Sequence, residues 1–190
     1  MKVGVLALQG AFREHAEMFA ALGADVVLVK LPEHLGAVDA IVLPGGESTT
    51  QDKLLDFSEL RAPLTAALRD GMPCLGTCAG LILLAREVLD GRADQQSLAM
   101  LDVAVRRNGY GRQVDSFESD LAIEGLVGGP LRGVFIRAPK IESVGAVDVL
   151  AECEGVPVLV RSGAVFGAAF HPELSGDLRL HQYFLSSIEV

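Results

Sequence analysis

The chain has 190 residues, of which 50% are hydrophobic and 5% are aromatic. This composition excludes a disordered chain and supplies enough apolar surface for a substantial core, so we expect one domain over residues 1–190. The formal net charge of −9 repels phosphate backbones and no basic run offsets it, so we expect no nucleic-acid partner.

The first half of the sequence alternates between short apolar strands and helical spacing. In chain order we expect strands 2–8, 25–30, 40–43 and 73–76, and helices 12–22, 60–69 and 79–85. One more helix is predicted to begin after the third strand, capped by Ser48 or Thr49. This alternation predicts a largely parallel sheet with helices on its faces.

The second half reads mainly as strands. We expect them at residues 101–105, 133–136, 141–144, 146–150, 156–161 and 164–169, with a closing helix over 177–187. Some of these strands show the two-residue alternation of a sheet with one face in water. No linker, repeat or low-complexity tract divides the chain.

The lengths of the apolar runs and the spacing of the cysteines indicate where the protein is located and whether it holds a metal. Residues 3–8 are too few for the hydrophobic region of a signal peptide, and no stretch approaches the roughly 18 apolar residues of a membrane span. The cysteines Cys74, Cys78 and Cys153 are an odd number without zinc-ligand spacing. We therefore expect a cytoplasmic protein that contacts no membrane and holds no metal or other cofactor.

The segment Gly76–Gly80 (GTCAG) lies between a predicted strand and a predicted helix. In this context a tight, strained turn can lift a nucleophile above the sheet edge, and the positive end of the helix favours a thiolate at Cys78. The alternative is a small buried cysteine in a glycine-rich turn. Cys74 falls inside an apolar strand and is expected in the core, whereas Cys153 is expected in a polar loop without a role.

A thiolate nucleophile requires a base and a group that orients the base. His171-Pro172-Glu173 follows the last predicted strand, and residues two apart in an extended chain point the same way, so Glu173 can reach His171. A surface turn with a solvated ion pair is the alternative. The other histidines, His15, His34 and His181, are expected to be surface or satisfied core residues.

The segment Pro44–Ser48 (PGGES) follows a strand, where glycines can turn backbone N–H groups toward a ligand. Acyl transfer needs such donors where the oxyanion develops, although a plain loop is the alternative. Together with GTCAG and the His171 segment, this makes three signals that all fall at carboxyl ends of strands, where open α/β sheets place their sites.

Segments spread over nearly the whole chain resemble the triad (class I) glutamine amidotransferases, and among them the glutaminase subunits of pyridoxal 5′-phosphate synthase. The matching segments are 8–15 (LQGAFREH), 44–50 (PGGESTT), 76–81 (GTCAGL), 107–113 (RNGYGRQ), 135–139 (FIRAP) and 170–174 (FHPEL). The resemblance implies a three-layer, flavodoxin-like α/β fold with a mixed but mostly parallel sheet and helices on both faces. One departure is Lys140, where the family often has histidine.

The resemblance also implies roles for particular residues. Cys78 would be the nucleophile, with His171 as its base and Glu173 as the group that orients the base. The amides of Gly46 and Ala79 would form the oxyanion hole. The glutamine pocket would be lined by Gly45, Gly46, Glu47, Arg107, Ile136 and Arg137.

The implied activity is hydrolysis of L-glutamine to glutamate and ammonia through a glutamyl thioester. The implied partner is a synthase subunit built on a (β/α)8 barrel, which uses the ammonia to make pyridoxal 5′-phosphate. One alternative is the glutaminase of another amidotransferase, such as imidazole glycerol phosphate synthase, which would share the triad and differ in its partner. The other is a non-catalytic, flavodoxin-like or redox-sensing cysteine module.

Overall fold

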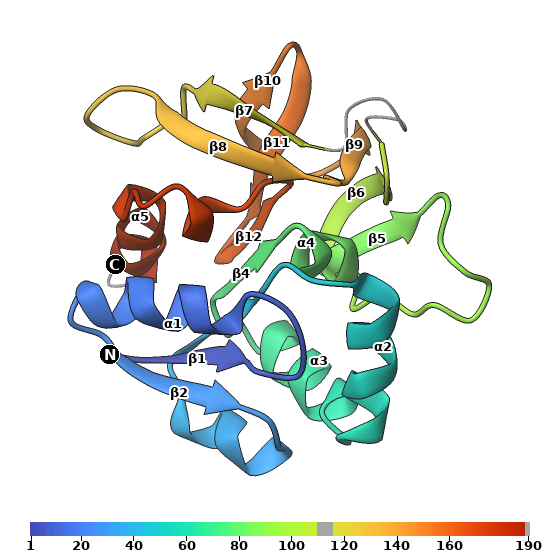
Figure 1. Cartoon of the computed structure of the whole chain (residues 1–190). Helices are drawn as coiled ribbons and strands as arrows, with labels where there is room; N and C mark the ends of the chain where they lie inside the picture. Colours follow the sequence, from blue (N-terminus) through green and yellow to red (C-terminus); the bar gives the residue numbers. More distant parts are fainter. Residues whose placement is uncertain (110–115, 189–190) are drawn as a thin grey trace.

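The computed structural model describes residues 1–109 and 116–188 (Figure 1). Its largest sheet has seven strands in the order β10-β11-β12-β4-β3-β1-β2. Their bounds are β1 (Lys2–Leu6), β2 (Asp25–Val29), β3 (Ala40–Leu43), β4 (Cys74–Thr77), β10 (Asp148–Cys153), β11 (Val156–Ser162) and β12 (Val165–Ala168). From β2 to β12, each strand pairs parallel with its neighbour. The remaining two pairings, β12 with β11 and β11 with β10, are antiparallel. The predicted mixed but mostly parallel sheet is confirmed.

Strands β3, β4 and β12 are buried along their whole length, which explains their continuous apolar sequences. A parallel strand that is covered on both faces needs apolar side chains in both directions. The sequence therefore predicts the buried strands of the first half of the chain from their apolar runs.

Helices cover both faces of this sheet, as predicted (Figure 1). Their bounds are α1 (Phe12–Ala21), α2 (Ser48–Phe57), α3 (Arg61–Arg69), α4 (Ala79–Leu84) and α5 (Arg179–Ile188), with short 3-10 helices η1 (Pro32–Ala37) and η2 (Pro172–Leu174). Helix α1 packs against α5, and α2 packs against α4. Right-handed crossovers between parallel strands place these two pairs on opposite faces, since β1 to β2 and β3 to β4 run in opposite directions across the sheet. Among the described residues, no helix combines the length and apolarity needed to cross a membrane.

Two smaller sheets lie beside the large one. One consists of β5 (Ala85–Val88), β6 (Leu101–Arg106) and β9 (Lys140–Val144), and the other of β7 (Ser116–Leu121) and β8 (Leu131–Ile136). The sequence did not predict β5 or β7. Strand β5 has only four residues, two of them charged, and β7 (SFESDL) is exposed or half-buried along most of its length. Neither therefore carries an apolar run.

One expectation about the cysteines was wrong. Cys153 is the last residue of β10 and is 8% exposed, so it packs into the core and does not lie in a polar loop. The strand predicted at residues 146–150 in fact runs from Asp148 to Cys153. Cys74 is fully buried in β4, as expected.

The carboxyl ends of four adjacent strands, β1, β3, β4 and β12, meet at one edge of the large sheet (Figure 1). The segments that follow them contain Gln9 and Gly10, then Gly45 and Gly46, then Cys78, and finally His171. The parallel arrangement therefore gathers residues from both ends of the chain into one site.

Candidate active site

Cys78 occupies a strained turn between β4 and α4. Its φ of 49° lies in the left-handed region, which is unusual for a residue with a side chain. Glycines on both sides make the turn feasible, since a Cβ at Gly80 would lie 2.0 Å from the carbonyl oxygen of Leu43, and one at Gly76 would lie 2.8 Å from that of Gly80. The predicted elbow is confirmed, and it brings Cys78 to the floor of a cavity.

His171 lies between Cys78 and Glu173. Its Nδ1–H donates to Oε1 of Glu173 over 2.7 Å, and the ring lies close enough to Cys78 for the sulfur to raise the pKa of the imidazole. The predicted reach of Glu173 is correct, although residues Pro172–Leu174 form a 3-10 helix and not extended chain. Both His171 and Glu173 are buried, so the solvated surface turn does not occur.

The charges in this trio are interdependent. Burial lowers the pKa of His171, but the neighbouring Cys78 and the hydrogen-bonded Glu173 carboxylate outweigh burial and raise that pKa to about 10. Burial would raise the pKa of Glu173, yet the neighbouring His15 and the hydrogen bond from His171 lower it instead. At neutral pH the arrangement is therefore an imidazolium between a carboxylate and a sulfur.

The loop after β3 is fixed by hydrogen bonds at Gly45. The Gly45 carbonyl accepts from the Ala11 N–H over 2.9 Å, and the Gly45 N–H donates to the Thr77 hydroxyl over 3.0 Å. In a trans peptide the carbonyl and the next N–H point in opposite directions. The bond to Ala11 therefore turns the Gly46 N–H away from Ala11. Ala79 is the first residue of α4, where an N–H has no acceptor within the helix.

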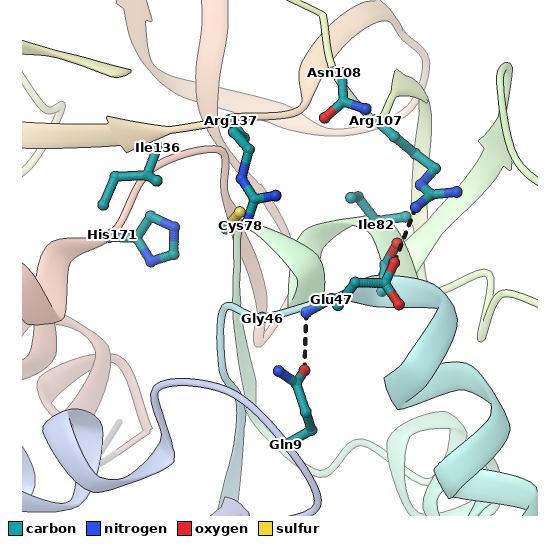
Figure 2. Close-up of a pocket in the computed structure, with 11 residues that line it drawn as sticks. Gln9, Gly46, Glu47, Cys78, Ile82, Arg107, Asn108, Ile136, Arg137 and His171 are labelled. Atoms are coloured by element: carbon teal, nitrogen blue, oxygen red, sulfur yellow. Dashed lines mark hydrogen bonds and ion pairs between the residues drawn. The ribbon is translucent and has the colours of Figure 1, made fainter. Parts of the chain in front are cut away.

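A cavity of about 330 Å³ opens above Cys78 (Figure 2), within the size range of small-molecule sites. Its lining includes Cys78, His171 and the predicted residues Gly46, Glu47, Arg107, Ile136 and Arg137. Gly45 does not line it but lies against the imidazole, since a Cβ there would lie 2.4 Å from Cε1 of His171.

The prediction missed four lining residues, which are Gln9, Ser48, Ile82 and Asn108. Gln9 and Asn108 belong to the matching segments 8–15 and 107–113, so the motifs contained a signal for them. Ile82 sits in an apolar helix and carried none. Residues 110–113 of the second segment lie outside the described residues.

Glu47 has a structural task that the sequence did not reveal. Its carboxylate caps α2 by accepting from the N–H groups of Thr49 (3.2 Å) and Thr50 (2.7 Å). Burial opposes ionisation, but the hydrogen bonds that the hydroxyl and N–H groups of Thr49 and Thr50 donate to this carboxylate together outweigh burial and lower the pKa of Glu47 to about 2. The cap was predicted at Ser48 or Thr49, and that prediction was wrong because the longer Glu47 side chain reaches back over the first turn.

Two arginines bring positive charge to the cavity. Arg107 Nη2 donates to Oε1 of Glu47 over 3.0 Å, and this pair forms one wall (Figure 2). Arg137 extends into the cavity toward Cys78 in the same view. Its φ of 42° is again in the left-handed region, and such strain is concentrated at functional sites.

A cysteine, a histidine and a glutamate in contact at the carboxyl edge of a mostly parallel sheet define the class of triad glutamine amidotransferases. Comparison with known proteins agrees. Residues 5–190 match the model of the SNO glutamine amidotransferase family. The chain belongs to this family and is a glutamine-hydrolysing enzyme. The alternative of a non-catalytic cysteine module therefore does not hold.

Individual similar proteins also indicate a glutamine amidotransferase. A pyridoxal 5′-phosphate synthase subunit PdxT of Rhodococcus jostii is 55% identical over 98% of this chain and 96% of its own length. One from a Roseiflexus species is 54% identical over 98% of this chain and 100% of its own length. A crystal structure described as a glutamine amidotransferase is 48% identical, covers 99% of each chain and has a TM-score of 0.93. A putative GMP synthase subunit of Thermoplasma acidophilum shares the fold alone, at 16% identity over 100% of this chain and 94% of its own, with a TM-score of 0.72.

Proposed function

We propose that this chain, as one domain over residues 1–190, is the glutaminase subunit of a pyridoxal 5′-phosphate synthase. It hydrolyses L-glutamine and passes the ammonia to a synthase subunit. The observation that carries the chemistry is that Cys78 and His171 line one cavity and that His171 is hydrogen-bonded behind it to the buried Glu173. The relatives named above support the choice of synthase over that of imidazole glycerol phosphate.

The first half of the reaction forms a thioester. The Cys78 thiolate attacks the side-chain amide carbon of glutamine, and the negative oxygen that develops accepts hydrogen bonds from the N–H groups of Gly46 and Ala79. The imidazolium of His171 then gives its proton to the leaving nitrogen. The carbon–nitrogen bond breaks, and ammonia departs.

The second half returns the enzyme to its starting state. His171, now neutral, takes a proton from a water molecule, whose oxygen attacks the thioester carbon. The carbon–sulfur bond breaks to give glutamate and the Cys78 thiolate. Glu173 stays ionised throughout and keeps the imidazole aligned through its 2.7 Å hydrogen bond.

The cavity wall suits the charged end of glutamine. The α-carboxylate and the α-ammonium require groups of both signs, and Arg107, Arg137 and Glu47 supply them. Gly46 and Ile136 complete the lining, while Gly45 lies against the His171 imidazole, where a Cβ would collide with the ring. We further propose a cytoplasmic location and a (β/α)8-barrel partner, both of which rest on the family resemblance.

The decisive experiment for this function follows the nitrogen. Glutamine labelled with heavy nitrogen at its amide is supplied to the chain together with a cognate synthase subunit and its phosphorylated sugar substrates. We expect labelled pyridoxal 5′-phosphate, and unlabelled ammonium salts should compete with the label. Glutamate release without label in that product would contradict the proposed partner while leaving the glutaminase chemistry intact.

The raised pKa of His171 predicts the pH dependence. Because the folded value is about 10 and the ordinary value is 6.5, the imidazolium stabilises the fold fully below 6.5, and this contribution is lost as the pH rises through about 10. We expect glutaminase kcat/KM to hold through mild alkaline pH and to fall with a midpoint near 10, where His171 loses the proton that it gives to the leaving nitrogen. Steady-state kinetics against pH checks this, and a decline centred near 6.5 would contradict the ion pair.

A further inference from the structure

A buried polar chain continues behind Glu173, on the side away from Cys78. It consists of His15 from α1, Thr77 from β4 and His181 from α5, and all three are 0% exposed. His15 Nε2 lies 3.3 Å from Oε2 of Glu173 and 3.0 Å from the Thr77 hydroxyl oxygen. On the other side of the ring, His15 Nδ1 lies 2.9 Å from Nε2 of His181.

Both histidines carry a single proton at neutral pH. Burial lowers the pKa of His15, and the nearby Glu173 carboxylate only partly offsets this. Burial, reinforced by the neighbouring His15, lowers the pKa of His181 to about 3. Each ring therefore has one N–H and one lone pair, and the surroundings decide which nitrogen holds the proton.

The contacts favour the proton on His15 Nε2. In that tautomer the N–H donates to the Thr77 oxygen and brings its positive end to within 3.3 Å of Glu173 Oε2, while His15 Nδ1 accepts from His181 Nε2–H. The opposite tautomer would turn a lone pair toward the Glu173 carboxylate. It would also leave the His181 Nδ1–H buried, and that atom has no hydrogen-bond partner in the described part of the chain. An unsatisfied buried donor is costly.

We propose that His15 is a positioning residue for the glutaminase reaction: the polar contact of its Nε2 with Oε2 at 3.3 Å holds the Glu173 carboxylate from the side opposite His171. The proposal rests on the proposed function, because it assigns Glu173 the task of orienting His171. Within the described residues, His15 is the sole polar contact of the buried Oε2 atom of Glu173. That oxygen accepts no hydrogen bond in the described part of the chain, so without His15 the buried end of the carboxylate would lose its one electrostatic partner.

Thr77 extends this arrangement to the oxyanion loop. Its hydroxyl oxygen accepts from the Gly45 N–H over 3.0 Å while it contacts His15 Nε2 over the same distance. One buried chain therefore joins the group that orients the base to the loop that carries the Gly46 N–H. Glu173 and the loop that carries Gly46 are therefore positioned by the same buried contacts, which come from α1 and β4.

The test replaces His15 by two residues of similar length. His15→Gln keeps an amide N–H near the position of Nε2, whereas His15→Met fills the space without a donor. We expect the Met variant to lose about ten- to a hundredfold in kcat, as is typical when the outer partner of an oriented active-site group is removed. KM should stay within about threefold in both variants, because position 15 does not line the cavity. The Gln variant should retain most of kcat.

Controls separate positioning from stability. Phe19→Leu loosens the packing around His181, whose ring centroid lies 5.0 Å from that of Phe19, but removes no hydrogen bond of the polar chain. It should lower the melting temperature and leave kcat unchanged. A purely structural role for His15 predicts that Gln and Met lose activity equally, and either that result or full kcat in the Met variant would overturn the proposal.

A second pair of variants covers a failure of His15→Met to fold. Thr77→Ser keeps the hydroxyl and should retain kcat, while the near-isosteric Thr77→Val should lower it, and equal kcat in the two would refute the link through Thr77. Cys78→Ala is assayed in parallel. Glutamate release by that variant would overturn the proposed function itself, and the positioning role with it, whereas failure at His15 alone leaves the nucleophile standing.

Discussion

Cys78→Ala is expected to lower glutamate release by several orders of magnitude while the protein keeps its fold. Removing the nucleophile of a catalytic triad eliminates the covalent route, and the remaining groups act as a unit that cannot replace it. Alanine fits the site because the turn already accepts a Cβ at φ 49°. The measurement is steady-state glutamate release by the complex with its synthase subunit, alongside circular dichroism.

The other cysteines provide matched controls. Burial raises the pKa of the Cys74 thiol, and Cys153 is 8% exposed, so both are packing residues. Cys74→Ala and Cys153→Ala should retain kcat, with stability losses limited to the small cavities they leave. Ammonium salts should restore pyridoxal 5′-phosphate formation by the Cys78→Ala complex, because they bypass the glutaminase. Undiminished glutamate release by Cys78→Ala would exclude Cys78 as the nucleophile.

Gly10→Ala is expected to lower kcat about a hundred- to a thousandfold, the usual cost of losing one oxyanion donor. A Cβ at Gly10 would lie 1.9 Å from the Gly45 carbonyl oxygen, too close for any real contact. That oxygen must then move, and the hydrogen bond from Ala11 that fixes the Gly45–Gly46 peptide is lost. The N–H of Gly46 would no longer be held in its productive orientation.

Gly23→Ala is the control for Gly10→Ala. Both glycines have left-handed backbones, with φ of 99° at Gly10 and 81° at Gly23, so both substitutions carry a backbone cost of about 1 kcal/mol. At Gly23, however, nothing lies within 4 Å of the added Cβ. A fall in kcat confined to Gly10→Ala is expected, and that variant should also have the lower melting temperature because it alone loses the Ala11–Gly45 hydrogen bond. Equal kcat in the two variants would show that the Gly45 carbonyl does not control the reaction.

The sequence predicted the parts of this site whose signal is local. Cys78 stands between an apolar strand and an apolar helix, and His171 reaches Glu173 across a single proline, so their geometry follows from neighbouring residues. The family resemblance supplied the pocket residues Arg107, Ile136 and Arg137, which no spacing rule would have brought together. All three line the cavity because the smaller sheets carry them over the edge of the large one.

The parts that escaped prediction depend on contacts between distant segments. His15 was expected to be an ordinary surface or core histidine, because nothing near it in the sequence shows that Thr77, Glu173 and His181 surround it in the fold. Glu47 was expected in the pocket but not as a helix cap. Strand β7 lacked an apolar run because much of its length faces solvent.

The proposed glutaminase mechanism requires a covalent bond between glutamine and Cys78. The complex is mixed with glutamine, quenched in acid within a turnover, digested and examined by mass spectrometry. We predict a glutamyl adduct on the peptide that contains Cys78, and none on those that contain Cys74 or Cys153. Glutamate release without any adduct on Cys78, or an adduct on another residue, would contradict the mechanism.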